Sequence, residues 1–321
     1  MKRTSLLVSA GLLLLLTGCA APRKAGMCSI AVPREARLVL SAEEWFDLLL
    51  HGYDREQGTA ARPTLDCSGS PVVWQEPAAD ECRQPGPDVP LLPTSPRLTD
   101  EDLVMATLQA DQRLVWVITR RYANGEALGP VGLVERTDTG LVVRALGSLR
   151  SFPLHSKLTL ERVGGTQVLV AEGEQCTLEG PSVCRRFARL LPLRHGRFFA
   201  ETVTSQDGKC LGPTWFPFSH EQNFLLPSGL HRQLVMTSTL KFDADGIRIN
   251  EEVTVHDLDP KRPALPARLQ RRVSAERKLQ LKGNQMEGTD ASLWVRLEEQ
   301  EKRKGATRLE ATTSAQAKST P

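Results

Sequence analysis

Apolar residues alternate with polar ones over short runs through most of the chain beyond residue 113, and turn-forming residues separate the runs. Alternation with a period of two is typical of β-strands that bury one face. The runs that predict strands are residues 114–122, 132–136, 140–146, 157–163, 167–171, 198–204, 234–242, 247–256, 272–281 and 291–297. The dipeptides that suit tight hairpin turns are Asn124-Gly125, Gly164-Gly165, Asp207-Gly208 and Asp245-Gly246. We therefore expect a mainly β protein whose antiparallel, hairpin-rich sheet forms a sandwich, an open barrel or a strongly curved sheet.

The regions on either side of the alternating part have other patterns. Ser41 is expected to cap one short N-terminal helix over about residues 42–51, with acidic residues in its first turn. Residues 52–96 are dense in proline, which removes backbone donors, so we expect a long loop there. Residues 298–321 are charged and then small and polar, and they lack apolar residues to bury. This composition predicts a disordered C-terminal tail.

The first residues have the layout of an export signal. A short positive stretch with Lys2 and Arg3 precedes an apolar run, residues 6–16, which is too short to span a membrane. The run ends in Leu16, Thr17, Gly18 and Cys19. This ending resembles the lipobox of bacterial lipoproteins, and the resemblance covers only about the first 20 residues. It implies cleavage between Gly18 and Cys19, lipid on the Cys19 sulfur, and acylation of the new amino terminus, typically by palmitate.

The resemblance also implies a location. Two acyl chains make a stable membrane anchor, whereas one chain binds only marginally. Ala20 and Ala21 follow the cysteine, and the aspartate that retains lipoproteins in the inner membrane of enteric-type bacteria is absent. We therefore expect a cell-envelope protein anchored in the outer membrane, on its periplasmic or surface face. The expected divisions are a signal peptide (1–18), a lipidated stalk ending in a strand near 37–40 (19–40), a helix with a disulfide-tied loop (41–99), a β domain (100–297) and the tail (298–321).

The cysteine content fits an oxidising compartment. Besides Cys19 there are six cysteines, and an even number in an exported chain favours disulfides. The candidates are Cys28, Cys67, Cys82, Cys176, Cys184 and Cys210. Cys176 and Cys184 are the pair we expect first, because the residues between them suit a turn, and Cys210 would then pair with an N-terminal cysteine. No CxxC pair occurs and the histidines do not cluster beside the cysteines, so no metal site is predicted.

Known catalytic motifs are missing from the chain. The segment beginning His220-Glu221 lacks the second histidine of a zinc protease, because Phe224 stands in its place. Residues 241–252 have the spacing of a calcium loop, but Lys241 occupies a position that needs an oxygen ligand, so a hairpin turn is favoured. Nucleophile-elbow, phosphate-loop and dinucleotide motifs are absent too. We expect a non-enzymatic protein with no cofactor beyond the covalent lipid.

Two stretches are candidates for a binding surface. One concentrates positive charge and the other concentrates aromatic residues between prolines; the candidates are Arg185, Arg186, Arg189, Arg194, Arg197, Trp215, Phe216 and Phe218. Each has a plainer interpretation: a strand with solvated arginines, and a proline-broken loop that plugs one end of the core. The formal net charge of +3 gives no reason to expect nucleic acid as a partner.

The leading functional hypothesis is an interaction or assembly module that binds an envelope protein and is held at the membrane by Cys19. A carrier of a lipid or other apolar ligand in a β cavity is the first alternative. An extracytoplasmic hydrolase is the second, and it would require a concave site that brings together carboxylates, or a histidine with a serine, such as a site involving His155, His195, His220, His231 or His256.

Overall fold

The computed structural model describes residues 28–31, 40–54, 59–66, 69, 90–93, 97–176, 184–199, 202–262, 264–282 and 285–309. Gly18, Cys19, Cys67 and Cys82, the predicted strand at residues 37–39, most of the proline-dense region and residues 310–321 lie outside these ranges, as does the side chain of Cys28. Strands dominate the described residues and pair mostly antiparallel, so the prediction of a mainly β fold is confirmed.

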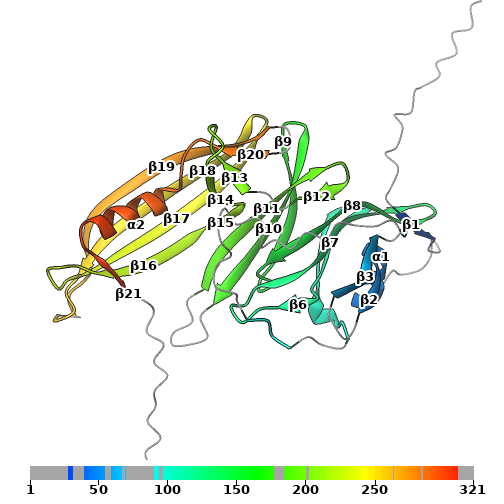
Figure 1. The fold of residues 1–321 in the computed structure, drawn as a ribbon, viewed down its shortest axis with the longest axis horizontal. Coiled ribbons are helices and arrows are strands. Elements are labelled where there is room, and N and C mark those ends of the chain that lie inside the picture. Colours follow the sequence, from blue (N-terminus) through cyan, green and yellow to red (C-terminus); the bar gives the residue numbers. More distant parts are fainter. Residues whose placement is uncertain are drawn as a thin grey trace, which may run out of the picture.

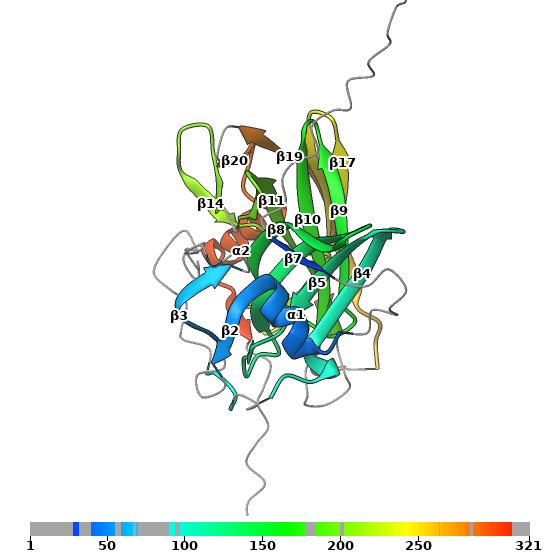
Figure 2. The same cartoon turned by 90° about the vertical axis from the view of Figure 1, so that its right-hand side faces the viewer.

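The first sheet has eleven strands and curls into a nearly closed, barrel-like shape (Figure 1). Its main path runs β4-β5-β7-β8-β12-β11-β10-β9, and its two end strands, β4 and β9, contact each other (Figure 2). Its strands are β1 (Cys28–Ala31), β4 (Leu103–Gln109), β5 (Gln112–Val117), β6 (Arg120–Arg121), β7 (Ala127–Thr137), β8 (Gly140–Ser151), β9 (Lys157–Val163), β10 (Thr166–Cys176), β11 (Cys184–Arg194), β12 (Arg197–Phe198) and β15 (Trp215–Pro217). The sequence left open a sandwich, an open barrel or a strongly curved sheet, and this sheet is strongly curved and nearly closed.

Large apolar side chains fill the interior of this barrel-like sheet. Trp116, Ile118, Leu149 and Leu169 are all completely or almost completely buried and pack in one cluster. Close strand packing requires Gly129 in β7, because a Cβ there would lie 1.7 Å from the carbonyl oxygen of Val117. The centre of the sheet is therefore a packed core.

Helix α1 (Ala42–Leu49) covers the outside of the barrel. As predicted, Ser41 caps it: the Glu44 amide donates to Ser41 Oγ (3.3 Å), and the Ser41 amide donates to Glu44 Oε2 (2.7 Å). Trp45, Phe46 and the following leucines bury its apolar side against outward-facing valines of β5, β7 and β8. The helix thus has the partner surface that its short, apolar sequence needs.

In the N-terminal region, the structure adds a strand to the expected stalk and contradicts part of the expected loop. β1 lies within the expected stalk and pairs with β8. β2 (Leu50–Asp54) and β3 (Thr59–Asp66) form a two-stranded sheet inside the segment expected to be a loop. The proline argument fails for this ribbon because both of its strands are edges, where a missing backbone donor is tolerated.

The second sheet has eight strands in the order β14-β13-β20-β19-β18-β17-β16-β21. Its strands are β13 (Thr202–Thr204), β14 (Cys210–Pro213), β16 (Ser219–Leu225), β17 (His231–Asp243), β18 (Gly246–Leu258), β19 (Arg268–Lys282), β20 (Gln285–Gly288) and β21 (Thr307–Leu309). Part of one face packs against β10 and β11 through Ile247, Ile249 and Leu279, and another part is covered by α2 (Leu293–Arg303) (Figure 1).

The C-terminal prediction is wrong for residues 291–309, and residues 310–321 lie outside the described ranges. Residues 291–297, expected to be a strand, lead into α2, and residues 298–309 of the expected tail continue α2 and form β21. Leu293, Trp294 and Leu297 face the sheet at helical spacing, and Ser292 Oγ accepts the Trp294 amide (3.2 Å). Glu301 is fully buried yet ion-paired with Arg232, which composition alone does not reveal.

The predicted hairpin turns are confirmed. Gly125, Gly164 and Gly208 have positive φ, and Asp243 pairs with Gly246 across the β17–β18 turn, which is the hairpin expected in place of a calcium loop. Residues 198–204 do not form the single strand expected, because β12 and β13 belong to different sheets. A short 3₁₀ turn (Asp100–Asp102) precedes β4. Neither described helix has both the length and the apolar character needed to cross a bilayer.

Candidate functional site

The two candidate binding stretches are adjacent in the structure. β11 carries all of the candidate arginines except Arg197, which is in β12. β15 carries Trp215 and Phe216, and Phe218 lies between β15 and β16. β11 and β15 pair antiparallel, with Arg189 opposite Trp215 and Ala188 opposite Phe216. The aromatic stretch is thus two short strands, β15 and β16, rather than the loop expected. The sequence placed these residues about 30 positions apart, and strand pairing brings them together.

The arginines do not form one patch, because alternation along β11 sends them to opposite faces. Arg189 is only 5% exposed and its guanidinium lies 5.9 Å from the centre of the Trp215 ring. Arg186 is exposed, ion-paired with Glu172, and stacked over Phe218 at 5.3 Å. The remaining partners are the Glu221 carbonyl for Arg185 (3.2 Å), the Gln285 carbonyl for Arg194 (3.5 Å) and Asp66 for Arg197 (3.7 Å). The interpretation as a strand with solvated arginines therefore holds for Arg186, which is exposed, and fails for Arg189, which is buried.

The aromatic residues divide in the same way. Phe216 is buried in the core between the two sheets, as expected for a core-plugging segment. Trp215 packs with Phe152 and Phe187, with all three ring centroids 5.2 Å apart. Phe218 is half-buried and remains accessible beside Arg186. Of the predicted residues, Arg186 and Phe218 are the two that meet at an open hollow.

That hollow is a groove of about 500 Å³ between β10–β11 and β16–β17, which we call the junction groove. Its lining residues are Val170, Glu172, Arg186, Phe218, Ser219, Ser238, Thr239, Leu240 and Phe242. The apolar part comes from both sheets, and the ion pair between Arg186 and Glu172 lies at its barrel side. The groove therefore offers an apolar surface, an aromatic ring and paired opposite charges within one small volume.

Sequence reasoning missed Glu172, Leu240 and Phe242. A signal for Glu172 was present: Val168 and Val170 precede it at two-residue spacing, so a carboxylate stands where the strand pattern calls for a third apolar residue. Leu240 and Phe242 belong to an ordinary alternating strand, and nothing in that pattern distinguishes residues that line a groove from residues of a closed core.

Two other hollows lie on the surface. One of about 340 Å³ lies beside α1 and the turn between β4 and β5, and is lined by Trp45, Asp111, Arg113 and Arg136, among others. A shallow one of about 470 Å³ lies over the polar side of β17–β19, where Thr237, Glu252 and Ser274 are partly or fully exposed. Neither combines exposed aromatic surface with a charged pair, so the junction groove is the better candidate for recognition.

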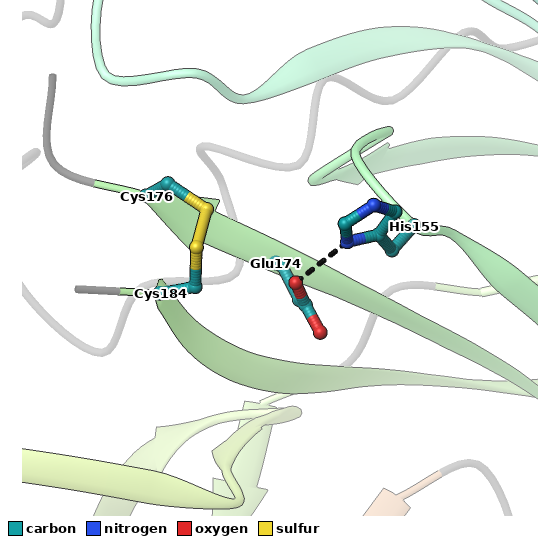
Figure 3. The surroundings of a disulfide bond; sticks show 4 residues. All are labelled: His155, Glu174, Cys176 and Cys184. Carbon is teal, nitrogen blue, oxygen red and sulfur yellow. Dashed lines mark hydrogen bonds and ion pairs between the residues drawn. A yellow bond between two sulfur atoms is a disulfide. The ribbon is translucent and has the colours of Figure 1, made fainter. Parts of the chain in front are cut away.

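The histidines do not assemble a catalytic arrangement among the described residues. His155 Nδ1 lies 2.8 Å from Glu174 Oε2 on an exposed surface (Figure 3). His220 packs edge-on against Trp294 at 4.2 Å. Burial, with a smaller effect from the nearby guanidiniums of Arg185 and Arg308, lowers the pKa of His220 to about 4. None of the described histidines, including His195, His231 and His256, forms a hydrogen bond with a serine.

The expected disulfide between Cys176 and Cys184 is present and joins the ends of β10 and β11 (Figure 3). Glu174 lies close enough to both sulfur atoms for the three to form a potential metal-ligand set. A disulfide sulfur is not a thiolate ligand, so these residues do not form a zinc site as they stand. Cys210 is disulfide-bonded as well. Its pairing with a particular N-terminal cysteine remains a prediction, because the side chains of the candidates Cys28, Cys67 and Cys82 lie outside the described residues.

No protein-family model matches this chain, and no curated protein or solved structure shows detectable similarity to it.

Proposed function

We propose that this protein is a non-enzymatic, lipid-anchored component of the bacterial outer membrane that binds a segment of another envelope protein in the junction groove. The anchor rests on the order of charge, apolar run, small residues and cysteine that ends at Cys19. The binding role rests on one observation: Phe218, Leu240 and the Arg186–Glu172 ion pair line the same open groove.

The groove's chemistry matches what protein recognition needs. Aromatic residues and arginine are enriched among the residues that dominate binding energy at interfaces. The Arg186 guanidinium is already held by Glu172 and by the ring of Phe218, so less side-chain freedom is lost on binding. A complementary segment would place an apolar side chain against Leu240 and Phe242 and polar groups beside the ion pair.

Site-specific photocrosslinking in cells tests the proposal. Benzoylphenylalanine replaces Phe218, with a matched control at Val295, an exposed apolar position on α2 away from the groove lining. We expect crosslinking to a discrete envelope protein from position 218 and none from position 295. Equal patterns from both positions, or no protein adduct from position 218, would overturn the groove assignment.

Substitutions then measure how much the groove residues contribute to the affinity for the partner. Once the partner is identified, Phe218→Ala and Arg186→Ala should each weaken binding by about 30-fold, the effect of losing a residue worth roughly 2 kcal/mol. Val295→Ala is the control and should leave affinity unchanged. Unchanged affinity in both groove variants would contradict the proposal even if a partner is found.

A carrier of an apolar ligand is the second candidate, because a groove of about 500 Å³ is large enough for a small lipid fragment. It has less support, because packed side chains such as Trp116 and Leu149 occupy the barrel interior. Native mass spectrometry distinguishes the two candidates: a retained lipid that Phe218→Ala releases would favour the carrier.

A further inference from the structure

The end of the second sheet farthest from β1 carries an exposed loop with an unusual combination of residues. β18 ends at Leu258 and β19 begins at Arg268, and the connecting loop projects at the left end of the molecule in Figure 1, whereas β1 lies at the right end. We call residues 257–262 and 264–272 the distal loop. Leu265 is 54% exposed and Leu269 is 52% exposed. Exposed large apolar side chains grouped at a protruding tip are typical of an interaction surface.

A third leucine belongs to the same surface. Leu225, which is 39% exposed, ends β16 opposite His231. His231 and Gln233 share a face of β17, Gln233 lies opposite His256, and His256 lies opposite Leu269. The register shifts between Val255 and His256, and the pairing puts Leu225 and Leu269 at the same end of the sheet.

Positive charge surrounds these leucines. The distal loop has five basic residues against two acidic ones. Asp257 is ion-paired with Arg232 from β17, and Asp259 is ion-paired with Arg262 within the loop. Lys261 and Arg268 are exposed and have no ion-pair partner among the described residues. The accessible charge at this tip is therefore basic.

We infer that the distal loop docks on an anionic lipid surface, inserting its leucines among the headgroups while Lys261 and Arg268 contact lipid phosphates. Apolar side chains flanked by lysine and arginine bind membrane interfaces by burying apolar area and by attraction to acidic lipids. This contact does not depend on acylation of Cys19. It lies at the opposite end of the fold from β1, which is the first described strand after the anchor.

Vesicle co-sedimentation of the chain without acyl groups tests the inference. The protein begins at Ala20 and is produced in an oxidising compartment, so that every described element is kept and lipid chains cannot cause binding. We expect binding to vesicles that mix phosphatidylglycerol with phosphatidylcholine, weak binding to phosphatidylcholine alone, and loss of binding as salt rises. Equal binding to both vesicle types would overturn the role of charge, and no binding to either would overturn the inference.

Matched double variants assign the binding to the loop. Lys261→Gln combined with Arg268→Gln should weaken binding about 30-fold. Each basic residue near an acidic surface contributes about 1 kcal/mol to the binding free energy, and two such losses correspond to that change in affinity. Lys157→Gln with Arg162→Gln, two exposed basic residues on β9, should have no effect.

Leucine variants test insertion. Leu265→Ser with Leu269→Ser should weaken binding by at least about 5-fold per leucine, since about half of each side chain is available for burial. Met105→Ser with Leu154→Ser is the control, because these side chains are 48% and 44% exposed elsewhere on the barrel. All four changes are on exposed side chains, so thermal melting should confirm intact folds. Equal losses in the loop and control pairs would contradict insertion by the distal loop.

Discussion

Glu251 provides the sharpest test of how the second sheet holds α2. Its side chain is 3% exposed, and both carboxylate oxygens accept hydrogen bonds. Oε1 accepts from Arg277 Nη2 (3.0 Å) and from Ser292 Oγ (2.9 Å), and Oε2 accepts from the Leu293 amide (2.6 Å). One buried carboxylate therefore neutralises a guanidinium and satisfies the first turn of α2, where the helix dipole also favours negative charge.

Glu251→Ala should lower the free energy of unfolding by about 3 to 5 kcal/mol, because it leaves Arg277 charged and without this partner inside the protein. Such a loss is a large fraction of the roughly 5 to 15 kcal/mol that stabilises a typical domain. Urea unfolding, followed by circular dichroism, measures the loss as a lower midpoint at an unchanged slope. Adding Arg277→Met to Glu251→Ala should restore part of the stability, since an apolar pair can replace a buried ion pair.

The control is the next residue along the same strand. Glu252 points to the opposite, solvated face, where it lies 3.5 Å from an exposed Arg272. Glu252→Ala should cost at most about 1 kcal/mol, as is usual for exposed ion pairs. The reasoning is refuted if Glu251→Ala and Glu252→Ala cost the same, or if removing the Arg277 charge recovers nothing.

Three further predictions concern the histidine, the disulfide and the anchor. His220 is neutral in the folded state down to about pH 4 but protonates near its ordinary pKa of 6.5 when unfolded, so stability should fall as pH drops through that window. After allowance for solvent screening, the free energy of unfolding should fall by about 1 to 2 kcal/mol. Urea titrations at several pH values measure this loss, and His220→Phe should abolish it. If the variant keeps the same dependence of stability on pH, His220 is not its cause. Replacing Cys176 and Cys184 with serine should cost about 2 to 3 kcal/mol, measured in the same assay, and peptide mapping without reductant should recover that pair from the wild type. Cys19→Ser should block lipid labelling in cells, and globomycin should cause the wild-type precursor to accumulate; continued labelling of the variant would rule out Cys19 as the acylated residue.

Local chemistry in the sequence was sufficient for many elements of the fold. The strand over residues 157–163, the cap at Ser41, the hairpin at Asp245-Gly246 and the bridge from Cys176 to Cys184 all agree with the structure. Each of these features depends on residues that are close together in the sequence, so the local pattern predicts it without knowledge of long-range contacts.

Errors arose where distant residues decide the outcome. Residues 298–303 lack apolar side chains to bury, which favoured a tail, yet they belong to α2, where Arg232 from β17 and Arg271 from β19 pair with the buried Glu301. The ribbon of β2 and β3 likewise forms although the local composition disfavours it.

The candidate site shows the same division. The sequence alone identified Arg186 and Phe218 as members of two separate stretches and indicated an export signal ending at Cys19. Only the tertiary structure placed Arg186 beside Glu172 and over Phe218, and joined them with Leu240 from the second sheet in one groove. Strand pairing and sheet packing set these distances. The distances between groove residues depend on which face of each strand packs against the other sheet. Alternation along a single strand does not determine which face that is.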